Sequence, residues 1–183
     1  YIDKGIDLYP DRLDMRFGKI YMLGETEDYT SFTSEIVRAI EYAQTIHYKW
    51  KWKAGEPLED SLEFFLGSIQ GYVGKLYDTE DDALLPNMRQ ISETVLKYHP
   101  NHVESLSNVA ITYVLTGDYD KGLTYLLRAE KVNPKDMIVL NNIAECYKRK
   151  GDKANAIIYL KKIIQNGDAD EAESARQRLK ELQ

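Results

Sequence analysis

The chain has 183 residues, of which 43% are hydrophobic and 5 are proline, so it is long enough to bury the core of one packed domain. Its net charge is −6, and the acidic excess lies in residues 1–102, which hold 18 Asp/Glu and 11 Lys/Arg, against 12 and 13 in residues 103–183. A net acidic chain argues against a nucleic-acid groove, which needs clustered cations, and no apolar run has the length needed to cross a bilayer.

Residues 1–9 are predicted to be the end of a helix. Their spacing matches a later segment, with Tyr1, Ile2, Gly5, Leu8 and Pro10 falling where Tyr125, Leu126, Ala129, Val132 and Pro134 fall. Because the match covers only the end of that segment and no initiator Met precedes it, we expect a truncated upstream helix. The 183 residues are then a piece of a longer protein, or a mature product whose leader was removed.

Residues 11–48 are predicted to form a degenerate helix hairpin. The first helix carries Phe17, Gly18 and Tyr21 on one stripe. The second runs from about Ser31 to Tyr48, and its apolar face consists of Phe32, Ile36, Ile40 and Ala43, with Val37 and Ile46 beside them.

The run from Tyr48 to Lys53 alternates aromatic residues with lysines. Trp50 and Trp52 in such a run can stack on bases, contact lipid headgroups or anchor a peptide. The favoured interpretation is that both tryptophans seal the junction between the first hairpin and the helix beginning near Leu58, while the lysines stay in water.

Residues 58–100 are predicted to form a second degenerate hairpin, with one helix within 58–77 and another from about Pro86 to Tyr98. Gly67, Gly71 and Gly74 lack the Gly-Lys-Ser/Thr of a phosphate loop, so we expect close helix packing or a helix bend there. The acidic run at 78–82 lacks the pattern of a calcium loop and is expected to be a solvated turn.

Residues 103–136 form a 34-residue unit that recurs over 137–167. The first copy places the residues that define the unit at Leu106, Val109, Ala110, Tyr113, Gly117, Tyr119, Gly122, Leu126, Ala129 and Pro134. The second copy has Leu140, Ile143, Ala144, Tyr147, Gly151, Lys153, Ala156, Leu160, Ile163 and Asp168 at the same places. Each copy thus has two apolar stripes separated by a glycine, which predicts two packed helices, and small residues that face each other across them.

Capping residues predict where these helices begin and end. Asn101 followed by Glu104 is typical of a capping box, and Asp136 is placed as the N-cap of a helix beginning at Met137. Asn166 and Gly167 end a helix, and Asp168 with Glu171 begins the next one, over 169–182. Its narrow apolar stripe is typical of a terminal capping helix and contains Ala172, Ala175, Leu179 and Leu182.

The residues of the two clear repeats resemble the tetratricopeptide repeat (TPR) family, and the general appearance of the chain resembles uncharacterised bacterial TPR proteins. The resemblance implies an all-α fold, a right-handed superhelical array of antiparallel helix hairpins, here one TPR-like domain over 1–183. It would comprise the two degenerate repeats (11–48 and 58–100), the two clear repeats (103–136 and 137–167) and the capping helix 169–182.

The resemblance also implies a protein-binding module, whose concave groove holds a peptide or helix of a partner against the first helix of each repeat. Matching the family's contact places onto this chain gives a protein-binding groove whose principal residues are Asn108, Ile111, Leu115, Asn141, Asn142, Glu145, Lys148 and Arg149. The remaining contact positions of the family correspond to Glu104, Ser107, Val114 and Ile138 in this chain. Ser107 and Asn141 stand where the family's carboxylate clamp needs other residues, so that clamp is not expected.

No catalytic, cofactor or metal site is predicted, and the chain is not expected to be an enzyme. His99 and His102 have a metal-ligand spacing, but Pro100 interrupts the helix that would align them. Cys146 is the single cysteine, so it forms no internal disulfide and does not decide between a cytoplasmic and a periplasmic location for a soluble protein.

The alternative to partner binding is a self-associating scaffold, a possible homo-oligomer whose groove is filled by its own chain or by another copy. If the chain were an enzyme, its active site would have to lie in the irregular region 56–85. No nucleic acid and no integral membrane segment are expected.

Overall fold

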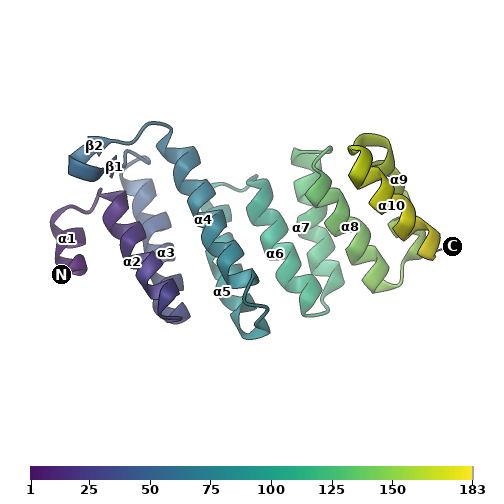
Figure 1. Ribbon diagram of the computed structural model, residues 1–183, viewed down its shortest axis with the longest axis horizontal. Coiled ribbons are helices and arrows are strands. Elements are labelled where there is room, and N and C mark those ends of the chain that lie inside the picture. The colour runs from purple at the N-terminus through teal and green to yellow at the C-terminus, as the bar shows by residue number, and fades with distance from the viewer. Residues whose placement is uncertain (183) are drawn as a thin grey trace. The chain divides into compact units, whose positions relative to one another are not determined.

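The computed structural model describes residues 1–182, which are mainly helical (Figure 1). The chain divides into two compact units, Tyr1–Tyr98 and His99–Gln183. The all-α class expected from the resemblance is confirmed.

The first unit consists of five α-helices, one small pair of strands and two short 3-10 helices, η1 (Lys53–Gly55) and η2 (Asp82–Leu84), within the described residues. The helices are α1 (Ile2–Leu8), α2 (Leu13–Glu25), α3 (Tyr29–Thr45), α4 (Ser61–Tyr77) and α5 (Leu85–Tyr98). The helix α2 packs against α1 and α3, and α5 packs against α3 and α4. Asn87 links α5 to α3, because its Nδ2 donates to the carbonyl of Tyr29 at 3.2 Å and to Oγ1 of Thr33 at 2.8 Å.

A short antiparallel ladder between α3 and α4 was not predicted. The strands β1 (Lys51–Trp52) and β2 (Glu56–Pro57) pair across a turn in which Ala54 and Gly55 both have positive φ. Trp50 directly precedes the ladder and Trp52 lies within it. The Trp50 side chain is 1% exposed and stacks on Phe65 with ring centroids 5.4 Å apart. Trp52 is half-buried and meets Phe64 edge-on at 5.4 Å. The interpretation that the tryptophans seal this junction therefore holds for Trp50, whose buried ring is not available to a base, a lipid or a peptide.

The glycines of α4 do not have the role expected from close helix packing. A Cβ atom built on Gly67, Gly71 or Gly74 meets no atom within 4 Å beyond its own helix. No helix therefore approaches α4 at these three positions closely enough to exclude a side chain, and the expectation of close packing there is wrong.

The second unit is a run of helices in which each follows the last after a short turn. Its described elements are α6 (Val103–Leu115), α7 (Tyr119–Val132), α8 (Met137–Lys150), α9 (Lys153–Asn166) and α10 (Ala169–Leu182). The helix α6 packs on α7, α7 on α8, α8 on α9 and α9 on α10. The predicted helix pairs are thus present, with a break at each of the two predicted glycines.

The 34-residue sequence repeat is also a repeat of local structure. Gly117 and Gly151 have nearly the same left-handed φ, +84° and +83°, which an L side chain rarely adopts. Tyr113 stacks on Tyr125 with centroids 5.9 Å apart, and the residues 34 positions later, Tyr147 and Tyr159, stack at 5.8 Å. Each helix pair is therefore closed by a glycine turn and a tyrosine stack.

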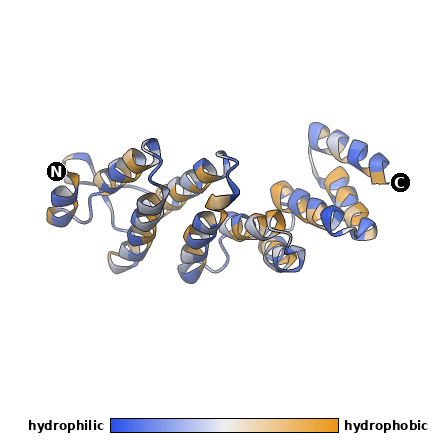
Figure 2. Cartoon of the chain, turned by 90° about the horizontal axis from the view of Figure 1, so that it is seen from below, coloured by the Kyte–Doolittle hydropathy of each residue, from blue (hydrophilic) through white to orange (hydrophobic). Residues whose placement is uncertain are grey.

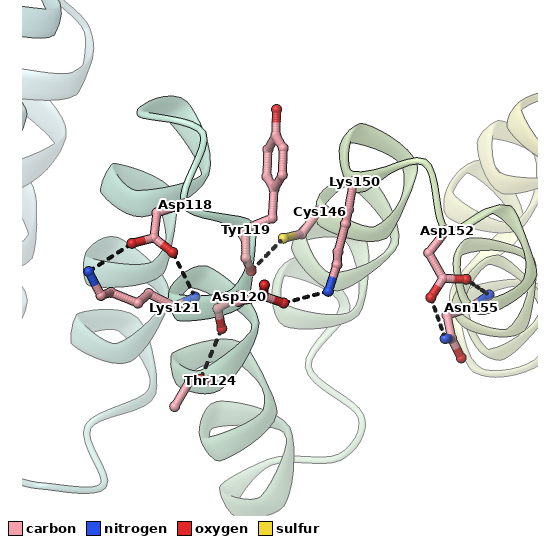
Figure 3. Close-up of polar contacts among 9 residues, drawn as sticks. All are labelled: Asp118, Tyr119, Asp120, Lys121, Thr124, Cys146, Lys150, Asp152 and Asn155. Atoms are coloured by element: carbon pink, nitrogen blue, oxygen red, sulfur yellow. Dashed lines mark hydrogen bonds and ion pairs between the residues drawn. The ribbon is translucent and has the colours of Figure 1, made fainter.

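Figure 3 shows how polar contacts begin the second helix of each repeat and join neighbouring helices. Asp118 Oδ1 accepts from the backbone N–H of Lys121 at 3.2 Å, and Asp152 Oδ1 accepts from that of Asn155 at 3.1 Å. Lys150 of α8 pairs with Asp120 of α7. The first and second repeats are thus capped in the same way and are linked to each other.

The structure confirms most of the predicted helix caps and corrects one. Asp136 caps α8 by accepting from Val139 N–H at 3.0 Å, and Asp168 and Glu171 accept from each other's backbone N–H at 2.9 Å, a complete capping box. The prediction that Asn101 caps α6 is wrong. His102 occupies that position, because its extended backbone directs the ring Nδ1 toward the N–H of Ser105 at 3.3 Å.

The helix α10 covers α9 as expected of a capping helix. Ala172 and Ala175 are buried, whereas most of its other residues are charged or polar, and Figure 2 shows the helix as largely hydrophilic. A narrow stripe of small residues therefore closes the apolar side of α9.

Two glycine substitutions test the close approach of α6 and α7. A Cβ at Gly122 would lie 2.7 Å from Cγ2 of Val114 and 3.3 Å from the carbonyl oxygen of Ala110, whereas a Cβ at Gly71 meets nothing. We expect Gly122→Ala to lower the free energy of unfolding by about 1–3 kcal/mol through overpacking. The matched change Gly71→Ala should raise it by about 0.5–1 kcal/mol through helix propensity. Urea denaturation followed by circular dichroism measures both, and equal effects of the two variants would contradict this account of the packing.

Candidate partner-binding face

The predicted binding residues all lie on α6 and α8, the first helices of the two clear repeats. These two helices contact each other within the second unit. We call the side of α6 and α8 that carries these residues the α6/α8 face.

The helix α6 contributes mainly apolar residues to this face. Leu115 at its C-terminal end is 37% exposed, and Ile111, one turn earlier, is half-buried. Asn108 is half-buried, and Glu104 is exposed and lies 3.3 Å from Nε2 of His102. The side chains at two other predicted contact positions of α6 are buried.

Ser107 and Val114 are each 6% exposed, so neither presents its side chain to a partner. Val114 packs toward Gly122 of α7, which leaves its methyl groups inside the helix pair. Matching the contact positions of the TPR family onto the sequence does not predict this burial, because the burial depends on how closely the neighbouring helices approach α6. The accessible apolar part of α6 is therefore centred on Ile111 and Leu115.

The helix α8 adds a large exposed apolar side chain and an amide. Ile138 in its first turn is 70% exposed. Asn142 is half-buried, and the structure assigns its side chain no hydrogen bond with the described residues. Asn141, in contrast, is already engaged, because its Nδ2 donates to the carbonyl of Met137 at 2.9 Å and its Oδ1 accepts from Arg178 at 2.8 Å. Of the two amides on α8, Asn142 is the one available to a peptide backbone.

The C-terminal half of α8 carries a chain of ion pairs that extends onto α10. Arg149 Nε donates to Glu145 at 2.9 Å, and Arg178 Nη2 lies 3.6 Å from the same carboxylate. Lys148 Nζ lies 3.7 Å from Glu181. Most of these side chains are exposed to solvent, and each such ion pair stabilises the fold by about 0–1 kcal/mol. A ligand can therefore replace one of these ion pairs by its own at little cost in free energy.

Arg178 and Glu181 of α10 contact this face, although the repeat pattern predicts binding residues only on α6 and α8. The apolar stripe of α10 predicts that this helix packs on α9, but it does not predict which polar side chains of α10 reach α8.

The structure shows where the one cysteine and the possible metal ligands are placed. Among residues 1–182, no group of three or more His, Cys, Asp or Glu side chains is placed to hold a metal ion. Cys146 is buried, its Sγ donates to the carbonyl of Tyr119 at 3.5 Å, and burial raises the pKa of its thiol to about 11. Cys146 thus has the packing role expected of a small side chain. None of the helices in this part of the chain has both the length and the apolar character to span a bilayer.

Comparisons with known proteins agree with the repeat structure. The tetratricopeptide repeat family matches residues 103–136 and 139–166. No curated protein is significantly similar in sequence to this chain. Among solved structures, the crystal structure of YrrB, a TPR protein with an unusual peptide-binding site, matches with a TM-score of 0.51 at 16% identity, over 97% of this chain and 98% of that chain. At that identity the likeness shows the fold.

His102 makes the stability of the second unit depend on pH. Burial lowers the pKa of His102 below its ordinary value of 6.5. The neutral ring is the form that caps α6, because an unprotonated Nδ1 is needed to accept from Ser105. The stabilisation is therefore complete above pH 6.5 and is lost as the pH falls through the lower folded pKa.

Replacing His102 by Asn, a good N-cap that does not titrate, isolates this effect. We expect the free energy of unfolding of the unmodified chain to fall from pH 7.5 to pH 5.5, and His102→Asn to make that fall smaller. Urea denaturation at a series of pH values measures it. An unchanged slope in the variant would show that other groups cause the pH dependence.

Proposed function

This chain belongs to the tetratricopeptide repeat (TPR) family through its repeats at 103–136 and 139–166, and we propose that it is a non-catalytic module that binds a peptide or helix of a partner protein on its α6/α8 face. Proteins of this family are generally protein–protein interaction modules. The exposure of Ile138, at 70%, is the observation that carries the choice of face.

The apolar part of the face supplies the driving force. Leu115 and Ile138 leave large aliphatic surfaces in water on two adjacent helices, although the cores of both helix pairs are well filled. Burying a fully exposed Ile or Leu side chain contributes about 1.5–3 kcal/mol. A ligand that covers these two residues and Ile111 gains a part of this free energy from each of them, in proportion to the apolar area that it buries.

The polar part of the face supplies orientation. The amide of Asn142 has both a donor and an acceptor, which matches the N–H and C=O of an extended or helical backbone. The ion pairs of Glu145, Lys148 and Arg149 lie beyond it on the same helix. A ligand with one apolar side and one charged side fits this order, as in helix-in-groove recognition. That YrrB, a protein of the same fold, has a peptide-binding site makes a peptide a suitable first ligand.

A pair of isoleucines in one repeat tests this proposal. Peptides selected from a random library against the immobilised chain are measured by fluorescence polarisation with Ile138→Ser and with Ile158→Ser. Ile158 is 50% exposed but lies on the second helix, α9, so it serves as the matched control. We expect Ile138→Ser to weaken binding about 5- to 30-fold, the equivalent of about 1–2 kcal/mol, and Ile158→Ser to leave it unchanged.

The same peptides are measured with Asn142→Ala and with Arg149→Ala. Both changes should weaken binding, while thermal unfolding stays nearly unchanged because neither side chain is buried in the core. Ligands that are indifferent to Ile138 and Asn142 but sensitive to Ile158 would place the binding face on the second helices and overturn the proposal.

A self-associating scaffold is the second candidate, and one observation favours it. The chain's own α10 already presents Arg178 to Asn141 and Glu145 of α8, so a helix of this chain is chemically compatible with part of the face. In that case Leu115 and Ile138 would be covered by another copy. Light scattering across a concentration series separates the two functions, because a dimer abolished by Ile138→Ser supports self-association and a monomer at all concentrations excludes it.

A further inference from the structure

The first unit contains a pocket of about 310 Å³ that shares no residue with the α6/α8 face. It is lined by residues of α1, α2 and α3, among them Arg16, Lys19, Glu35 and Tyr42. Its volume is at the lower end of the range of small-molecule sites. All the elements that form it belong to one compact unit.

Arg16 is the unusual residue of this pocket. It is only 9% exposed, and its Nε donates to the carbonyl of Pro10 at 2.9 Å. Its guanidinium lies 4.5 Å from the centre of the Tyr42 ring and 5.8 Å from that of Trp50. The structure assigns no hydrogen-bond acceptor among residues 1–182 to either of its Nη groups.

An aromatic ring attracts the guanidinium but supplies no lone pair to its N–H groups. Burial lowers the pKa of Arg16, yet an arginine stays protonated at neutral pH. Burying a guanidinium whose Nη groups have no acceptor is costly, because these groups lose hydrogen bonds to water that no protein atom replaces. The pocket in front of Arg16 is the space in which such an anion would bind.

The other cations of the pocket already have carboxylate partners. Lys19 Nζ lies 2.6 Å from Asp3 and 2.9 Å from Glu35, and Arg38 Nη1 lies 2.8 Å from Glu35. Glu35 is thus shared by two cations, neither of which is Arg16. Among the cations that line the pocket, Arg16 is the one to which the structure assigns no carboxylate partner within residues 1–182.

We propose that this pocket binds a carboxylate, which the two Nη groups of Arg16 hold in the bidentate geometry that guanidinium and carboxylate share. The three acidic side chains that line the pocket, Asp3, Asp7 and Glu35, favour a singly charged anion over a phosphate dianion, which they would repel more strongly. Ile6 and the Tyr42 ring give an apolar wall for the carbon atoms next to the carboxylate. The carboxylate belongs either to a small organic acid or to a peptide.

Sodium acetate is the probe that tests the shared chemistry. In the unmodified chain labelled with ¹⁵N, we expect acetate to shift the Arg16 Nε–Hε signal and the amides of α2 and α3 in a saturable way at millimolar concentrations, as is usual for one ionic contact. Sodium chloride at equal ionic strength should not reproduce these shifts, and inorganic phosphate should bind more weakly. Equal, non-saturating shifts with acetate and chloride would mean that only water occupies the pocket, which overturns the proposal.

Two arginine variants assign the contact. Arg16→Gln should weaken acetate binding at least tenfold, whereas Arg38→Gln, which removes a 67% exposed guanidinium from the same pocket, should retain it within about threefold. Retained binding in Arg16→Gln contradicts the proposal. If Arg16→Gln does not fold, as circular dichroism would show, the Arg16 signal of the unmodified chain still decides the question.

A short peptide with a free C-terminal carboxylate, compared with its C-terminal amide, identifies the source of the carboxylate. Tighter binding of the acid form than of acetate, with no binding of the amide, assigns a peptide terminus. Binding of the acid peptide no tighter than acetate assigns a small organic acid. Because the pocket and the α6/α8 face are on different units, either result is independent of the proposed function.

Discussion

The close approach of α6 and α7 at Ala110 and Gly122 is the constraint on which the clear repeats depend. The carbonyl of Ala110 would be 3.3 Å from a Cβ at Gly122, and in the next repeat the residues at the same places, Ala144 and Ala156, are both fully buried. Small residues at both positions let two helices pack along their whole length. The glycine turns at 117 and 151 and the tyrosine stacks then close each pair.

The packing of the second unit leaves side chains of both first helices accessible. The helices α7, α8 and α9 each contact the helix before and the helix after them in the chain. The first helices, α6 and α8, keep Leu115 and Ile138 partly in water, together with the amide of Asn142. The capping helix α10 covers α9, and its Arg178 and Glu181 contact α8. A partner on the α6/α8 face would therefore meet apolar and amide side chains of α6 and α8 next to charged side chains of α10.

The helices could be predicted where the residues that define them are local. Apolar stripes, the glycine breaks and the Asp136 and Asp168 caps lie within one or two turns of the boundaries that they set. The features that the sequence did not predict depend on distant partners. Trp50 is buried by Phe65, Asn141 is engaged by Arg178, and Arg16 is enclosed by α1 and α3. Even the α6 cap was misplaced by one residue, because a histidine nitrogen can accept a backbone N–H as an asparagine oxygen does.

The central claim is that α6 and α8 form the partner-binding face while α7 and α9 support it from behind. Hydrogen exchange followed by mass spectrometry, with and without a selected peptide, tests this directly because it reports every helix at once. The account predicts that the peptide slows exchange in 103–115 and 137–150 and leaves 119–132 and 153–166 nearly unchanged. Slower exchange confined to 119–132 and 153–166, or to the first unit, would contradict it.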